Sequence, residues 1–248
     1  MADPVVTLPD SYAACERLAR AHYENFPVAS RLMPRRLRPH VAAVYAFART
    51  ADDIADEPGR EPAERLHLLD EWRQRLHASQ PSTAGSRRTP APRIQWGPDE
   101  IFPALHDTIA RFDLPVDLFD DLLSAFAQDV VTTRYADWHA VTDYCRRSAN
   151  PVGRIVLRLS GYADEALDIR SDAVCTALQL TNFWQDLAID WSRGRLYVPE
   201  SEWSAAGASL ADLDRRAWTP EWREALEACG RRTRDLFDSG RGVCDRVG

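Results

Sequence analysis

The sequence predicts an all-α protein, and three observations favour that fold class. Apolar residues recur at helical spacing in one segment after another, as in the series Leu66, Leu69, Trp72 and Leu76. Proline and glycine separate these periodic segments. No segment alternates apolar and polar residues between hairpin turns, as a half-buried sheet would. At 248 residues, the chain is expected to form one helical bundle over residues 1–248.

The boundary residues predict the helices in order. Ser11 is expected to cap a helix that runs to about Ala21, and the next helix covers residues 39–57, where Pro58-Gly59 ends it. Further helices are expected at 61–78, 99–112, 115–130, 136–147, 151–160, 164–192 and from Pro220 toward the end. Residues 80–98, rich in Pro and Ser, predict a flexible loop inserted within the one bundle.

Composition and charge narrow the class of protein. Hydrophobic residues make up 45% and charged residues 28%, which is ordinary for a globular protein. The net charge of -7 argues against nucleic acid as a partner. The five cysteines form no CxxC pair, so we expect reduced thiols. Without a signal-peptide pattern or a long apolar run, the protein is expected to be cytoplasmic, with association at the inner membrane face left open.

Four polar residues follow one line along the helix expected at residues 39–57. These residues, the first acidic column, are Tyr45, Arg49, Asp52 and Asp56. Their spacing of i, i+4, i+7 and i+11 places them within about 60° on a helix surface, with Asp53 beside them. The rest of the helix is apolar nearly all round, which predicts burial. Buried charge is costly unless it is paired or bound to metal, so this column predicts a ligand.

A second acidic column follows the helix expected at residues 164–192. Its members are Gln179, Asn182, Asp186 and Asp190. They span about 80° of a helix surface, among apolar neighbours. Mg²⁺ prefers one or two carboxylates together with phosphate oxygens and water. Either column alone is commonly a solvated acidic turn, but the pair favours a Mg²⁺-dependent enzyme that binds a diphosphate, with Arg49 contacting phosphate and aromatic faces stabilising a carbocation.

These motifs resemble those of a known family. ARTADDIADE at 48–57 and QLTNFWQDLAID at 179–190 resemble the two aspartate motifs of the squalene/phytoene synthase family. ENFPVASRLMPRRLRPHVAAVYAFARTADDIAD at 24–56 and YCRRSANPVGR at 144–154 most resemble its bacterial hopanoid-pathway branch of squalene and hydroxysqualene synthases. The resemblance covers about residues 11–199, and it implies an isoprenoid-synthase helical bundle with a central active-site cavity.

The resemblance also implies a role for each site residue. Metal binding is expected from Asp52, Asp53, Asp56, Asn182, Asp186 and Asp190, with about two or three Mg²⁺ ions. Substrate contacts are expected from His22, Asn25, Phe26, Arg49, Tyr144 and Gln179. The catalytic residues are expected to be Asp52, Asp56, Asp186, Asp190 and Tyr45. Asn150 is a further catalytic candidate, which comes from a departure from the family pattern and not from the resemblance. For His22 alone, a capped surface histidine is nearly as good an interpretation.

One segment departs from the family pattern. Family members commonly read Tyr-Cys-x-x-Val-Ala-Gly-x-Val-Gly. Tyr144 and Cys145 begin the same pattern here, but Asn150-Pro151 stands where the pattern has Gly-x. Pro151 is expected to break or kink a helix. We hypothesise that Asn150 holds the water that ends the reaction, so Asn150→Ala would shift the product toward squalene. The alternative is that Asn150 satisfies backbone groups at the kink.

The expected reaction is the Mg²⁺-dependent conversion of presqualene diphosphate to hydroxysqualene, without NADPH. An alternative is the condensation of two farnesyl diphosphates to squalene, which by the reductive route needs NADPH, or a phytoene-type coupling. No GxGxxG motif is present, although the family binds nicotinamide without one. An alternative of another class is a non-catalytic isoprenoid-binding or assembly protein, against which the retained aspartates argue. Pathway enzymes are further expected partners, and the C-terminal helix is expected to be incomplete at Gly248.

Overall fold

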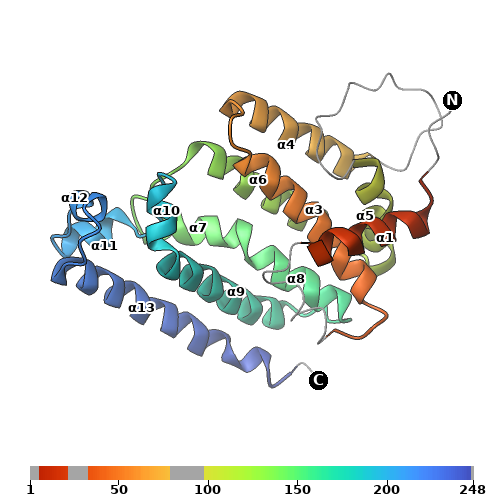
Figure 1. Cartoon of the computed structure of the whole chain (residues 1–248). Helices are drawn as coiled ribbons and strands as arrows, with labels where there is room; N and C mark the ends of the chain where they lie inside the picture. Colours follow the sequence, from red (N-terminus) through yellow and green to blue (C-terminus); the bar gives the residue numbers. More distant parts are fainter. Residues whose placement is uncertain (1–5, 22–32, 79–97, 247–248) are drawn as a thin grey trace. The chain divides into compact units, whose positions relative to one another are not determined.

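The computed structural model describes residues 6–21, 33–78 and 98–246, and these residues form helices joined by short connections (Figure 1). In these ranges the one β contact is an isolated bridge between Arg134 and Leu196. The all-α prediction is therefore confirmed. The expected loop at 80–98 lies almost entirely outside the described residues. None of the described helices has the length and apolar character needed to cross a membrane.

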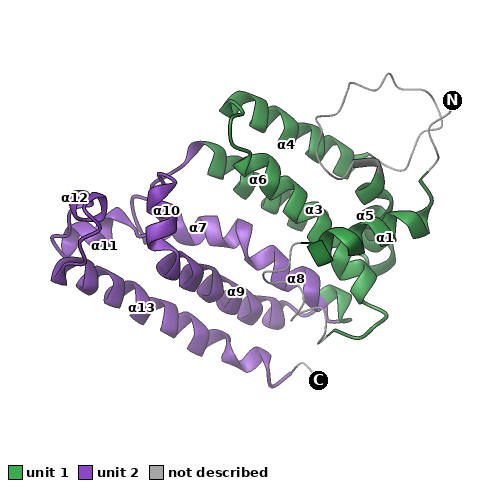
Figure 2. Cartoon of the chain, viewed as in Figure 1, with its two compact units in different colours: residues 1–130, 158–161 green, residues 131–157, 162–248 purple. Residues whose placement is uncertain are grey.

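The chain divides into two compact units (Figure 2). Unit 1 comprises residues 1–130 and 158–161, and its helices are α1 (Leu8–Ala21), α3 (Arg38–Asp56), α4 (Pro62–His77), α5 (Pro98–Phe112) and nearly all of α6 (Asp117–Val131). Unit 2 comprises residues 131–157 and 162–248, with α7 (Trp138–Ser148), most of α8 (Asn150–Leu159), α9 (Glu165–Gln185), α10 (Leu187–Ser192), α11 (Glu200–Ala205), α12 (Leu210–Asp214), α13 (Pro220–Gly240) and a 3₁₀ turn at Arg241–Val243. The single domain over residues 1–248 stays a prediction.

The core of unit 1 is an aromatic cluster around α3. Phe47 of α3 is fully buried, and its ring centroid lies 5.5 Å from Phe119, 6.0 Å from Trp72 and 6.1 Å from Phe102. These partners come from α6, α4 and α5, so this face of α3 packs against three other helices. Aromatic rings at such separations add edge and stacking attraction to the burial of apolar area. This anchoring fixes the rotation of α3 about its axis within unit 1.

Two residues define the end of α3. Gly59 has φ +84°, a left-handed conformation that favours glycine, and it turns the chain directly after the helix. The Arg65 guanidinium donates a hydrogen bond of 2.6 Å to the carbonyl of Ala55, one of the last carbonyls of α3. A cation there also interacts favourably with the helix dipole. The predicted stop at Pro58-Gly59 is confirmed.

Ser11 does not cap its own helix, because α1 begins earlier, at Leu8. Its side chain is buried, and the hydroxyl donates to the carbonyl of Glu100 at 2.5 Å and accepts from the amide of Ala104 at 2.9 Å. These are two groups four residues apart in α5, beside Pro103. A proline inside a helix disturbs the ladder around it. Ser11 therefore serves α5, a role that the pattern of α1 could not indicate.

The helix expected at 164–192 is two helices. α9 ends at Gln185, and Asp186 adopts φ -93° and ψ 8° before α10 begins at Leu187. Hydrogen bonds still join the Asp186 amide to the Asn182 carbonyl and the Asp190 amide to the Asp186 carbonyl, at 2.8 and 2.9 Å. The bend is therefore local. The bend places Leu187 in the core of unit 2. No proline or glycine marks this junction in the sequence, because a tertiary contact creates it.

The core of unit 2 forms where α13 packs along α9 and α11. Trp222 of α13 is fully buried, stacks on Trp203 with a centroid separation of 6.3 Å, and donates its indole N–H to the carbonyl of Ser209 at 2.9 Å. Leu196 and Cys229 complete the same cluster. The short helices α11 and α12 help enclose it. They were not expected, because five or six residues are too few to show a helical period.

The five cysteines are free, as expected from their spacing. Burial raises the pKa of Cys15, Cys145 and Cys229 to about 12, whereas Cys244 is exposed. The thiolate is the reactive form, so a buried neutral thiol reacts slowly. We expect N-ethylmaleimide at pH 8 to label Cys244 first and the three buried thiols only after unfolding, as read by peptide mass spectrometry. Rapid native labelling of Cys145 would contradict the packing of α7.

Candidate active site

The first acidic column lies on the side of α3 away from its aromatic anchor. Phe47 is about 140–160° around the helix from Asp52 and Tyr45. Most apolar positions between the column residues are buried, whereas the side chains of Arg49, Asp52 and Asp53 are 38%, 39% and 43% exposed. The column is thus partly accessible on a helix that is otherwise largely buried. Because Phe47 fixes the rotation of α3, the first acidic column lies on the accessible side of the helix.

Arg49 links the carboxylates of this column. Its guanidinium donates to Asp52 at 3.2 Å and to Asp53 at 2.5 Å. Burial works against its charge, yet Asp53 and Asp52 outweigh that effect and raise the pKa of Arg49. Its Nε atom is buried and has no hydrogen-bond partner within the described ranges. Buried donors are nearly always paired, so this arginine retains a donor for an anionic oxygen.

The second acidic column lies at the junction of α9 and α10. Asn182 and Asp186 are exposed, and Gln179 and Asp190 are partly buried. Leu178 and Ile189 beside them are each 52% exposed, so the column has apolar neighbours that are themselves accessible. The expected single stripe on one straight helix is corrected to a stripe that bends at Asp186.

Four aromatic side chains pack together in unit 2 next to this column. Tyr144 of α7 lies 5.7 Å from Tyr135, 5.9 Å from Phe183 and 5.8 Å from Tyr197, between ring centroids. Phe183 and Tyr197 stack face to face at 3.7 Å. Phe183 directly follows Asn182 in α9. The group brings π faces close to the acidic column, although Tyr144 itself is only 4% exposed.

Asn150 is the first residue of α8, and the helix boundary at Ala149 confirms the break expected from Pro151. Its side chain is 8% exposed, and Oδ1 accepts a hydrogen bond of 2.8 Å from the hydroxyl of Thr176 in α9. The contact joins two side chains from different helices. The Asn150 bond seen here is therefore not the backbone contact that the alternative interpretation expects at the kink.

The side chains of the two acidic columns fit a divalent metal only if a bound substrate supplies further oxygen atoms to the ion. Among the described residues, no group of three or more His, Cys, Asp or Glu side chains is arranged to hold an ion by itself. The accessible donors of both columns are carboxylate and amide oxygens, which are hard ligands. Mg²⁺ typically takes one or two carboxylates and completes its octahedron with phosphate and water. The carboxylate and amide oxygens of the two acidic columns match this preference of Mg²⁺.

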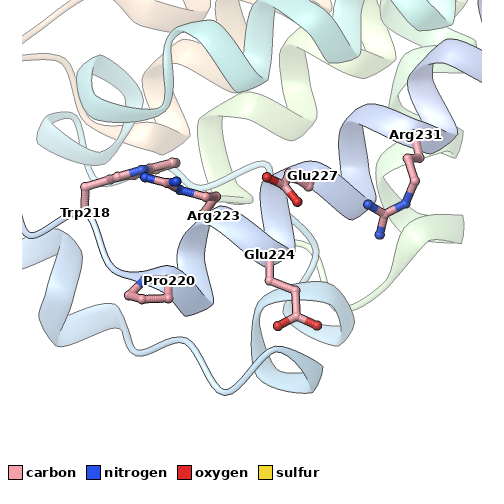
Figure 3. A pocket seen from close by; sticks show the side chains of 6 residues that line it. All are labelled: Trp218, Pro220, Arg223, Glu224, Glu227 and Arg231. Atoms are coloured by element: carbon pink, nitrogen blue, oxygen red, sulfur yellow. The ribbon is translucent and has the colours of Figure 1, made fainter.

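A separate pocket lies along the first half of α13. Its volume is about 580 Å³, and Figure 3 shows the side chains that line it: Trp218, Pro220, Arg223, Glu224, Glu227 and Arg231. None of the expected site residues is among them. Two glutamates lie between two arginines along α13, so the lining of the pocket carries both signs of charge and is not a cationic surface for a polyanion. It is not the site that the acidic columns predict.

The structure places the two columns in different units, with Asp52, Asp53 and Asp56 in unit 1 and Asn182, Asp186 and Asp190 in unit 2. Tyr144 and Asn150 accompany the second column in unit 2. The expected contacts His22, Asn25 and Phe26 lie outside the described residues. Sequence reasoning missed Thr176, because a threonine inside a helix gives no sign of a partner 26 residues earlier.

The helical fold, with one acidic column on α3 and another at α9 and α10, is that of an isoprenoid-processing enzyme. A family model described as squalene/phytoene synthase matches residues 19–247, and the chain belongs to this family. Enzymes of the family act on isoprenoid diphosphates and generally use a divalent metal.

Individual relatives agree with this assignment. The chain is 37% identical over 223 residues to a hydroxysqualene synthase of Zymomonas mobilis, covering 88% of this chain and 69% of that protein. It is 36% identical over 225 residues to one of Rhodopseudomonas palustris, covering 90% and 71%. A crystal structure of squalene synthase HpnC from Alicyclobacillus acidocaldarius is similar at a TM-score of 0.85 and 37% identity, over 97% of this chain and 86% of that one.

Arg49→Lys tests the bridging guanidinium. Lysine keeps the charge but cannot donate to two carboxylates and a phosphate in one plane. Loss of charge-assisted hydrogen bonds worth about 1.5–3 kcal/mol predicts a fall in kcat/KM of about 10-fold to 150-fold. Arg60→Lys is the matched control, since Arg60 also bridges two carboxylates, Glu57 and Glu64, just after the same helix. Equal effects of both changes would refute a specific role for Arg49.

Proposed function

We propose that the chain converts presqualene diphosphate and water to hydroxysqualene and diphosphate. The observation that carries the proposal is the 36–37% identity to two hydroxysqualene synthases over most of the chain. The two acidic columns support it, because a prenyl diphosphate needs bridging cations before carboxylates can bind it. The hydride donor NADPH has no part in this reaction, since the product is formed by water addition.

The roles of the acidic residues follow from this reaction. Asp52, Asp53, Asp56, Asn182, Asp186 and Asp190 would hold about two or three Mg²⁺ ions. Bound Mg²⁺ supplies neutralisation of the diphosphate charge as the carbon–oxygen bond breaks. Arg49 binds a phosphate oxygen through its available Nε–H. Gln179, Tyr45, Tyr144 and the segment with His22, Asn25 and Phe26 are proposed as further substrate contacts.

The reaction balances without a further reactant. The bond between carbon and the diphosphate oxygen breaks, and the electron pair leaves with diphosphate. The carbocation rearranges, stabilised by aromatic faces such as Phe183. One water oxygen then bonds to carbon, and the water proton passes to the departed diphosphate or to a tyrosine. Exclusion of bulk water keeps this capture to one position.

Product analysis tests the function against its alternatives. The purified protein is incubated with Mg²⁺ and either presqualene diphosphate or farnesyl diphosphate, each with and without NADPH. Hydroxysqualene from presqualene diphosphate without NADPH supports the proposal. Squalene or a phytoene-type product from farnesyl diphosphate would replace it with the coupling reaction. No diphosphate release from either substrate would favour a non-catalytic isoprenoid-binding protein.

Asn150→Ala is expected to change the product and not the ionisation. If Asn150 orders the terminating water, its loss lowers the fraction of hydroxysqualene about fivefold, the effect of about 1 kcal/mol of hydrogen bonding. Diphosphate release should stay within about twofold of wild type, since the change removes no phosphate contact. Gas chromatography of the products and a phosphate assay measure the two quantities. An unchanged product ratio would end the hypothesis.

Location and partners are proposed from the substrate. A C30 isoprenoid diphosphate is strongly apolar at one end, so we propose that the protein works at the inner face of the membrane and beside the enzymes that precede and follow it. Sedimentation with anionic lipid vesicles would test the proposed association with the membrane. Recovery of the protein only in the supernatant would refute it.

A further inference from the structure

Three contacts in one register hold α8 against α9. Asn150 accepts from Thr176, Gly153 lies against Ser171 and Cys175, and Arg154 forms a bidentate pair with Asp172 at 2.9 and 2.5 Å. Residue numbers rise along α8 as they fall along α9, which is the register of two antiparallel helices. A Cβ on Gly153 would collide with the Ser171 hydroxyl and the Cys175 sulfur. The missing side chain at Gly153 therefore leaves room for the Ser171 and Cys175 side chains of α9 against α8.

The Asn150–Thr176 contact lies at the edge of this register nearest the second acidic column. Thr176 and Phe183 are seven residues apart on α9, so they share a face about 10 Å apart along the helix axis. Thr176 is 7% exposed and Asn150 8%. Buried hydrogen bonds between side chains fix orientation strongly, because water does not compete for them.

The hydrogen bond decides which end of the Asn150 amide is available. Oδ1 is occupied by the Thr176 hydroxyl. In the described part of the chain, Thr176 is the one residue to which the Asn150 side chain is hydrogen-bonded. The other end, Nδ2, carries two N–H donors and no acceptor. An oriented Asn150 therefore offers donors to an oxygen ligand.

We propose that Thr176 is a positioning residue that fixes the Asn150 amide so that its NH₂ group holds the terminating water by its oxygen. The inference rests on the proposed function. One lone pair of the water accepts from Asn150, and the other forms the new bond to the carbocation. The water proton leaves to the diphosphate released in the same reaction, so every atom is accounted for. Asn150 thus acts as a donor, and Thr176 sets that polarity.

Thr176→Val removes the hydroxyl and frees the amide to turn. We expect the ratio of hydroxysqualene to hydrocarbon products to fall about fivefold with presqualene diphosphate and Mg²⁺. Thr176→Ser keeps a hydroxyl that can donate to Asn150. Its product ratio is therefore expected to stay within about twofold of the wild-type ratio. Thr181→Val is the matched control, because among the described residues that hydroxyl, on the same helix, bonds only to the Ala177 carbonyl. Equal product ratios in Thr176→Val and wild type would overturn the inference.

Two further variants separate positioning from general damage. Thr176→Val in an Asn150→Ala background should change the product ratio no further, since Thr176 acts through Asn150. Asn150→Asp keeps an acceptor for Thr176 but has no donor, so it should lose hydroxysqualene as Asn150→Ala does. If Thr176→Val does not fold, Asn150→Asp decides alone, and retained hydroxysqualene would overturn the inference. A wild-type protein that makes no hydroxysqualene at all would instead refute the proposed function, and this inference with it.

Discussion

Asp186→Asn is expected to reduce diphosphate release from presqualene diphosphate by about 10²–10³-fold at saturating Mg²⁺. Metal-assisted neutralisation of a leaving group is worth several kcal/mol, and each 1.36 kcal/mol is about tenfold in rate. The substituted asparagine would keep the shape of the side chain and one oxygen, but it would lose the charge that attracts the ion. A coupled phosphate assay measures the rate directly.

The position of Asp186 makes this change informative. It lies where α9 ends and α10 begins, and the hydrogen bonds that join the two helices there use backbone atoms. Asparagine tolerates such a junction conformation well, so the fold should persist. Asp238→Asn, on the exposed face of α13, is the matched control for loss of one carboxylate. Diphosphate release that persists in Asp186→Asn with Mg²⁺ present would remove this residue from the metal site.

Trp222→Ala is expected to have the largest effect on stability. Truncation of a fully buried tryptophan typically costs about 3–5 kcal/mol, from lost burial and the cavity that remains. The change also leaves the Ser209 carbonyl without its indole donor and Trp203 without its stacking partner. Because Trp222 belongs to the core that also holds Leu187, the loss reaches the junction that carries Asp186.

Urea unfolding followed by circular dichroism at 222 nm measures this effect without relying on tryptophan fluorescence. The midpoint should fall by about 1–5 M, because a loss of about 3–5 kcal/mol is divided by a slope of about 1–3 kcal/mol/M. Trp218→Ala is the matched control, since that tryptophan lies four residues earlier and is 55% exposed. Surface changes of this kind are usually within about 0.5 kcal/mol. Similar midpoints for the two variants would contradict the burial of Trp222.

Periodicity predicted the helices well where they are long. α3, α4, α5 and α13 begin within one or two residues of the expected positions. It could not predict α11 and α12, which are too short to show a period, or the junction at Asp186, which tertiary packing creates. Ser11 was assigned to the wrong helix because its partners, Glu100 and Ala104, are about ninety residues away.

The sequence by itself determined the fold class, the family and the two acidic columns, because helical period and motif spacing are local properties of the chain. Asp52, Asp53 and Asp56 could be placed on one helix surface from their spacing alone. Only the tertiary structure decided how α3 is anchored by Phe47, which donor of Arg49 has no partner among the described residues, and that Thr176 is hydrogen-bonded to Asn150. These are contacts between residues far apart in sequence, and side-chain burial and hydrogen bonding create them only once the helices pack.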